Sequence, residues 1–257
     1  MATARSLNRA IFNGTLYQSI RDLWFDGVPW GTKSPTEEAT QRWFQGTKEQ
    51  KAEFDKLCFQ KLNPAVVALS PTQFPIAGLS DTEIAEPFVA EIVAADNGGE
   101  ESTKTALSFM ILLDQIPRNL YRTKETLRLV FDHYDPIAVS LARHLATADP
   151  TTRLDMHPSI RHSLTYRMWF YMPLMHSERL ADHRIHQEYL DKLEKENSDD
   201  EEVSTMLARM QYFTKMHTDI IEKFGRYPYR NEYLGRESTD EEKKWLEDGG
   251  PRFGVGG

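Results

Sequence analysis

The sequence predicts a single all-α domain of stacked antiparallel helical hairpins. Apolar residues fill Phe109–Leu113 with almost no polar face, which is typical of a helix at the centre of a fold. We find no convincing alternating run of apolar and polar residues bounded by a hairpin turn, so strands are not expected. Helix-start signals are abundant instead: capping boxes, a Ser or Thr followed three residues later by Glu or Gln, occur at Thr47–Gln50, Ser80–Glu83, Ser198–Glu201 and Thr239–Glu242.

Further capping and stop signals set the predicted ends of the helices, each to within about three residues. Ser34-Pro35-Thr36-Glu37 and Asp135-Pro136 are interpreted as N-caps followed by a proline at the first helical position. Residues 96–99 are a break, and Gly225 is interpreted as the stop of the helix before it. The expected helices are 15–26, 35–45, 48–60, 81–95, 102–115, 124–132, 136–147, 158–180, 180–196, 200–224 and 240–247.

Two segments are expected to be irregular, and one helix to be distorted. Residues 61–80 carry three prolines and are interpreted as an irregular connection. Residues 249–257 are short and Gly-rich and are expected to form a loose tail. Within 158–180, Pro173 would deprive the Trp169 carbonyl of its usual donor, so the helix should bend or restart there.

Composition excludes several classes of function. The net charge of -8, from 31 basic and 39 acidic residues, argues against a general nucleic-acid binder. One cysteine, Cys58, excludes an intrachain disulfide and fits a reducing compartment. The first residues have no long apolar core, and no apolar run approaches the roughly 20 residues that span a bilayer. We therefore expect a cytoplasmic protein without a nucleic-acid or membrane partner.

The central apolar helix ends in a polar cluster that we interpret as one wall of a site. Asp114, Gln115, Arg118 and Asn119 follow the apolar run directly, and Pro117 among them is expected to break or kink the backbone. Buried charges persist only when they are paired or bound. The Arg118 guanidinium suits a carboxylate or phosphate, and its structural alternative is a buried salt bridge to Asp114 or Glu178.

Two more polar clusters follow apolar segments. His176-Ser177-Glu178 comes after WFYMPLM, and FGRYPYRNEYLGRES contributes further arginines and an asparagine, namely Arg226, Arg230, Asn231 and Arg236. His176 and Glu178 are two residues apart, which in a helix directs their side chains away from each other. Glu178 is expected to pair with Arg118 or Arg230.

These clusters leave two functions open. In the first, a pocket binds or transforms a small anionic molecule: Arg118 and Arg230 clamp the anion, Asp114 and Glu178 orient them or act as base, and His176 transfers a proton. In the second, the protein is an interaction scaffold, and the clusters are internal clamps. The candidate catalytic residues are His176, Glu178 and Asp114, and the candidate binding residues are Arg118, Asn119, Gln115, Arg226, Arg230 and Asn231.

Metal and cofactor chemistry have little support. His183 and His186 are spaced as metal ligands on one helix face, but the HExxH pattern is absent, and their charged neighbours suggest an exposed face. We therefore expect no metal. The sequence has no P-loop and no G-x-G-x-x-G, so no cofactor is expected. Cys58 is interpreted as a core residue.

Three motifs in order carry a resemblance to a known family. DQIPRNLYR, YMPLMHSE and the run from His217 to Arg236 resemble the DUF924 family, a group of uncharacterised proteins; LWFDG, from Leu23, resembles the family's opening element more weakly. The resemblance implies a helical fold similar to tetratricopeptide-repeat proteins and names no activity. The segment 61–100 is longer than is usual in the family and is expected to be an irregular or extended insertion. Tyr229 stands where the family commonly has His.

Overall fold

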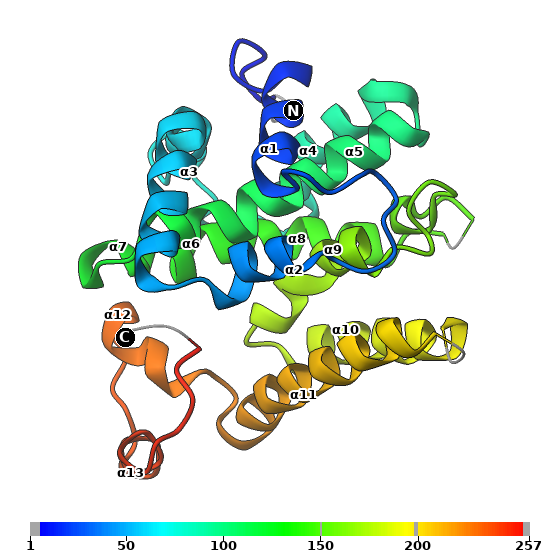
Figure 1. The fold of residues 1–257 in the computed structure, drawn as a ribbon. Coiled ribbons are helices and arrows are strands. Elements are labelled where there is room, and N and C mark those ends of the chain that lie inside the picture. Colours follow the sequence, from blue (N-terminus) through cyan, green and yellow to red (C-terminus); the bar gives the residue numbers. More distant parts are fainter. Residues whose placement is uncertain (1–5, 150, 198–199, 254–257) are drawn as a thin grey trace.

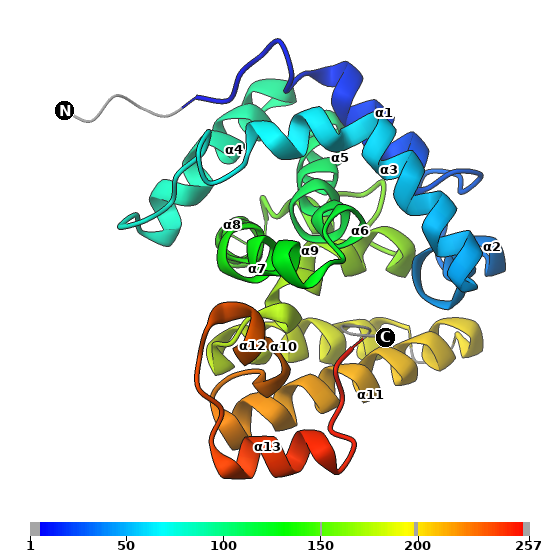
Figure 2. The ribbon, with the colours of Figure 1, turned by 90° about the vertical axis from the view of Figure 1, so that its left-hand side faces the viewer.

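The protein is all-α, as predicted. The structure, a computed structural model, describes residues 6–149, 151–197 and 200–253, and none of these residues lies in a strand. The helices form two layers, which can be told apart in Figures 1 and 2 and which contact each other. The first layer runs from α1 to α9, and the second layer contains α10 to α13.

The first layer is built around α5, Glu100–Met110, which contacts α1, α4, α8 and α9. Its short elements connect the long helices and frame the site described below. The other elements of this layer are α1 (Gly14–Trp24), α2 (Glu37–Thr40), η1 (Gln41–Gln45), α3 (Lys48–Ala68), α4 (Asp81–Asp96), η2 (Ile111–Gln115), α6 (Ile116–Leu120), α7 (Lys124–Leu129), η3 (Val130–Tyr134), α8 (Asp135–Ala146), η4 (Leu154–Met156) and α9 (Leu164–His176).

The second layer is a helical hairpin followed by short elements. α10 (Leu180–Glu196) packs along α11 (Glu201–Phe224), and α11 stops at Gly225, which has the left-handed φ of 67° that favours glycine. η5 (Pro228–Arg230), α12 (Asn231–Leu234) and α13 (Asp240–Glu247) then turn back beside the hairpin, as Figure 2 shows. The predicted stop at Gly225 is confirmed.

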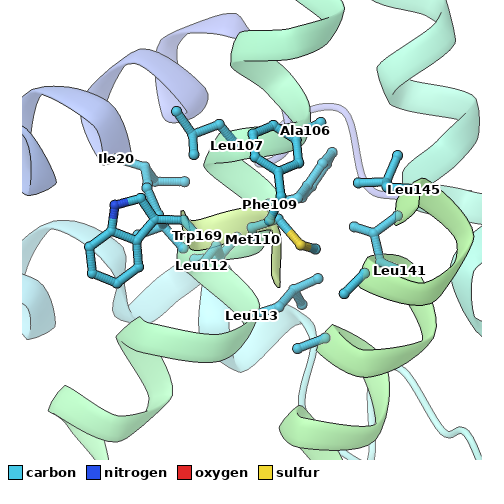
Figure 3. Packing of buried hydrophobic residues seen from close by; sticks show 14 of the residues in the cluster. Ile20, Ala106, Leu107, Phe109, Met110, Leu112, Leu113, Leu141, Leu145 and Trp169 are labelled. Carbon is cyan, nitrogen blue, oxygen red and sulfur yellow. The ribbon is translucent and has the colours of Figure 1, made fainter. Parts of the chain in front are cut away.

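The predicted central helix is confirmed by the packing around it. Phe109, Met110 and Leu113 are completely buried, and Figure 3 shows side chains from several helices closing over them. The ring of Phe109 meets the ring of Tyr17 edge-on at 4.9 Å between centroids. These buried apolar residues therefore fix the position of the C-terminal end of this helical segment, where the polar residues begin.

Two wide helical turns precede prolines near the site. In η2 the Ile116 N–H bonds to the Ile111 carbonyl, and in η3 the Asp135 N–H bonds to the Val130 carbonyl, each five residues back. Pro117 and Pro136 follow directly, and neither can donate a backbone hydrogen bond. Of the two expectations for Pro117, a break or a kink, the break is wrong, because the chain stays helical; the distortion takes the form of the wide turn η2 directly before it.

Several predicted helix ends change. α3 runs through Pro64 to Ala68, so residues 61–68 are not irregular, because Leu62, Ala65 and Val66 are buried by the fold. α9 is shorter than predicted and contains Pro173 without restarting.

The predicted caps are confirmed in part. The capping boxes at Thr47, Ser80 and Thr239 are confirmed. Thr36 rather than Ser34 caps α2. Residue 198 of the fourth predicted box lies outside the described residues, and α11 is capped by Asp200.

Candidate functional site

Five ionisable side chains meet where the two layers join, and we call them the junction site: Asp114, Arg118, Asp135, His176 and Arg230. Asp114 lies in η2 and Arg118 in α6, whereas Asp135 begins α8, His176 ends α9 and Arg230 ends η5. The wide turns η2 and η3 deliver the first three, and α9 ends at His176. Arg230, from the second layer, completes the group. Residues far apart in the sequence thus form one connected cluster.

Asp114 holds His176 by a direct hydrogen bond. The distance from Asp114 Oδ1 to His176 Nδ1 is 2.7 Å, and the second carboxylate oxygen accepts from the Gln115 amide. Burial opposes the charge of Asp114, but the positive charges of His176 and Arg118 outweigh it and hold the pKa of Asp114 well below its usual value. Asp114 is therefore an ionised carboxylate that orients the imidazole.

Arg118 bridges two carboxylates. Its Nη2 lies 3.2 Å from Asp114 Oδ1 and 2.6 Å from Asp135 Oδ1. The structural alternative for Arg118, a salt bridge to Asp114, is therefore present, and the one to Glu178 is not. The side chain is still 24% exposed, whereas its Nε atom is buried and has no hydrogen-bond partner among the described residues. The guanidinium therefore keeps donor capacity that its internal partners do not use.

Arg230 is enclosed rather than open. It is 4% exposed, and its guanidinium carbon lies 4.6 Å from the ring centre of Phe131 and 4.5 Å from that of Tyr227. Its Nη1 is 3.4 Å from Asp135 Oδ2. Burial opposes its charge, but Tyr229 and Asp135 outweigh it and raise the pKa of Arg230 above its usual value. The geometry makes Arg230 an internal counter-charge.

His176 keeps one ring nitrogen free. Its side chain is 16% exposed, and within the described ranges its Nε2 makes no hydrogen bond. The ring centre of His217 lies 6.3 Å away. An imidazole fixed by a carboxylate at Nδ1 and open at Nε2 is arranged to give or accept a proton.

Glu178 belongs to a different pair, so its expected pairing with Arg118 or Arg230 is wrong. It binds Arg236 through both oxygens, at 2.6 and 2.9 Å, and accepts from the Tyr227 N–H at 2.9 Å. Because α9 ends at His176, the chain has already turned at Glu178. Burial opposes ionisation of Glu178, but these partners lower its pKa.

The remaining candidate binding residues are held by other carboxylates. Arg226 and Asn231 both donate to Glu242, at the start of α13. Asn119 donates to Asp55 in α3 at 2.8 Å. Only Gln115, through Asp114, joins the junction site. The three sequence clusters therefore do not fold into one open pocket of arginines.

Asp135 is the site residue that the sequence interpretation missed. We expected it to cap a helix, but no side-chain cap bond forms there, and the carboxylate faces Arg118 and Arg230 instead. A signal was available: Asp135 is the one acidic residue in a stretch whose neighbours Tyr134 and Ile137 are apolar and buried.

The helix face with the paired histidines is buried, not exposed as expected. His183 and His186 are 1% and 2% exposed, and each ring bonds to a threonine of α11, Thr218 or Thr214. Their neighbour Asp182 binds Arg143 through both oxygens. In the part of the chain that the structure describes, no three metal-binding side chains gather. Cys58 is fully buried, as predicted.

Every helix among the described residues is too short or too polar to span a bilayer.

Comparison with known proteins adds a family and a fold. Residues 20–250 match a family model described as "Bacterial protein of unknown function (DUF924)". A solved structure of a protein of unknown function from Agrobacterium tumefaciens is 24% identical; the match covers 94% of this chain and 100% of that one, with a TM-score of 0.55. That likeness shows a shared fold. No functionally curated protein matches the chain.

Proposed function

The chain belongs to the DUF924 family, whose description names no activity, and we propose that its junction site binds a small anionic molecule and exchanges a proton with it through His176. The hydrogen bond of 2.7 Å between Asp114 Oδ1 and His176 Nδ1 carries this proposal. It fixes the ring and leaves Nε2 as the reactive position.

The charge balance of the junction site favours an anion. The carboxylates of Asp114 and Asp135 balance the guanidiniums of Arg118 and Arg230. When His176 is protonated, the cluster therefore carries one net positive charge. Arg118 Nη2 and His176 Nδ1 contact the same Asp114 oxygen, and both side chains are partly exposed, so an anion can meet both groups.

A thermal-shift comparison tests this function. The wild-type protein is melted with acetate and with inorganic phosphate, each at a concentration well above its dissociation constant. An anion at 100 times its dissociation constant adds about 2.7 kcal/mol to the native state. Arg118→Ala should bind at least tenfold more weakly, about 1.4 kcal/mol. Arg122→Ala is the matched control, because Arg122 is half exposed and pairs with Asp55.

Two results would contradict the proposal. Neither anion stabilises the wild-type protein, or the Arg118→Ala protein, still folded, gains as much from the anion as the wild type does. His176→Gln extends the test, because the amide cannot carry a proton at pH 7; a site that transfers protons should then lose turnover while keeping part of its affinity.

A protein-interaction scaffold is the second candidate, and the exposed aromatic pair on α11 favours it. Tyr212 is 63% and Phe213 39% exposed. The predicted likeness to tetratricopeptide-repeat proteins would fit this function and stays a prediction. For a scaffold, the junction site is an internal clamp, and Arg118→Ala should lower the free energy of unfolding by about 3–5 kcal/mol without any effect on anion binding.

A further inference from the structure

The ring of Phe253 fills an aromatic recess beside the junction site. Its centre lies 3.6 Å from that of His217, nearly parallel at 17°, and 6.3 and 6.0 Å from the rings of Tyr227 and Tyr229. We call these three residues the aromatic slot. Figure 2 shows the red segment after α13 passing α11 toward the first layer. One residue of the Gly-rich tail is thus anchored; residues 254–257 of that tail lie outside the described residues.

Phe253 is held almost only by its ring. Its φ is 47°, a left-handed conformation that bulky side chains rarely adopt. Within the described chain, the last backbone hydrogen bond of this segment is that of the Gly250 N–H to Trp245, so no backbone hydrogen bond holds Phe253 itself. The Phe253 side chain remains partly exposed. These features are typical of an occupant that can leave, not of a core residue.

The slot opens next to the proposed reactive group. His217, which Phe253 covers, has its ring centre 6.3 Å from that of His176. The opposite walls, Tyr227 and Tyr229, flank Arg230. A ring lying in the slot would therefore place a short acidic substituent within reach of the junction site.

We propose that the aromatic slot binds the flat ring of an aromatic carboxylate, with the carboxylate directed to the junction site, and that Phe253 occupies the slot until this ligand displaces it. The proposal rests on the proposed function and names its class of ligand. The slot supplies faces for ring stacking, and the junction site supplies the charge. No covalent step is part of the proposal.

Calorimetric titration of the full-length protein tests it with three matched probes: phenylacetate, acetate, which lacks the ring, and benzyl alcohol, which lacks the charge. Phe253→Ala should bind phenylacetate at least tenfold more tightly than the wild type, because the competing ring is gone. Acetate should change less than twofold. Arg252→Ala, on an exposed neighbour, should bind all three like the wild type.

The outcomes separate the two proposals. If acetate binding depends on Arg118 but Phe253→Ala binds phenylacetate no more tightly than the wild type does, the proposed role of the slot is wrong and the anion site stands. If benzyl alcohol and phenylacetate gain equally and Arg118→Ala has no effect, the slot stands and the anion site fails. Should Phe253→Ala not fold, the wild-type protein saturated with phenylacetate must show nuclear Overhauser contacts from the ligand ring to Tyr227 or Tyr229; their absence overturns the slot.

Discussion

Asp135 lies between two arginines, 2.6 Å from Arg118 and 3.4 Å from Arg230. Arg230 has almost no access to water, so its charge depends on this carboxylate and on the surrounding rings. Removing one partner of a buried ion pair leaves the other charge without compensation. The position of this side chain therefore determines whether the junction site can form.

Asp135→Asn is expected to lower the free energy of unfolding by about 3–5 kcal/mol. Urea denaturation measures the change. Asp132→Asn is the control, because Asp132 is exposed and its partner Arg128 is too, so the loss there should stay below about 0.5 kcal/mol. A loss below about 1 kcal/mol in Asp135→Asn would mean that Arg230 does not need this counter-charge.

The buried histidines predict how stability depends on pH. Burial lowers the pKa of both His186 and His217 to about 3, whereas an unfolded histidine titrates near 6.5. Below about pH 6.5 the unfolded chain therefore binds protons that the folded chain does not. The contribution of these histidines to the free energy of unfolding should be constant above about pH 6.5. As the pH is lowered from there to about 3, the free energy of unfolding should fall by up to about 1.4 kcal/mol per pH unit for each histidine.

Urea denaturation at several pH values between 7.5 and 5 measures this slope. His217→Gln should reduce the slope, and His144→Gln, which alters an exposed ring, should leave it unchanged. Equal stability at pH 7.5 and pH 5 would contradict the neutral, buried state of these two rings.

At the scale of elements, the end of α11 sets where the second layer approaches the first. Gly225 stops the helix with a left-handed φ, and the chain then turns to deliver Tyr227 and Arg230. A Cβ atom at Gly225 would meet no heavy atom within 4 Å, so a substitution there acts through backbone strain alone.

Gly225→Ala is expected to lower the free energy of unfolding by roughly 1 kcal/mol. Gly14→Ala is the matched control: a Cβ atom there also has open space, φ is not positive, and the residue begins α1, so it should be neutral or stabilising by about 0.4–1 kcal/mol. Thermal or urea denaturation of both variants measures the change. An equal change in the free energy of unfolding of the two would show that the positive φ of Gly225 is not the cause.

Local signals predicted the helix starts, and long-range pairing could not be predicted. The boxes at Thr47, Ser80 and Thr239 depend on residues three apart, which the sequence displays directly. Asp114 and Arg118 are one turn apart, so their contact was also predictable. The contacts of Asp135 with Arg118 and of Arg236 with Glu178, by contrast, join residues 17 and 58 positions apart, which no local pattern displays. An isolated Asp-Pro is also typical of a cap.

At the scale of the molecule, apolar side chains join the two layers in two clusters. The main core includes Tyr189 and Leu190 of α10, and a smaller cluster adds to it. Val130 and Phe131 of the first layer pack with Ile220, Ile221 and Tyr227 of the second. The Tyr227 hydroxyl also donates to the Met175 carbonyl at 2.6 Å. Separating the layers would expose these side chains to water, which is unfavourable.

The protein is therefore expected to unfold in one transition. Four of its five tryptophans, Trp24, Trp30, Trp43 and Trp169, report on the first layer, and Trp245 lies in the second. Tryptophan fluorescence and far-ultraviolet circular dichroism should give the same urea midpoint. Two separate midpoints would show that the layers are independent and that the junction site is a weak contact between them.

The central claim is that His176, fixed by Asp114, meets an anion beside Arg118. Its most direct test is an imidazole nitrogen spectrum of isotope-labelled protein during a titration with acetate. We predict that the Nε2 resonance of His176 shifts and saturates, that Nδ1 keeps its bond to Asp114, and that Arg118→Ala abolishes the shift. A His176 spectrum that does not change while acetate saturates the protein would contradict the claim, as would an equal shift in Arg118→Ala.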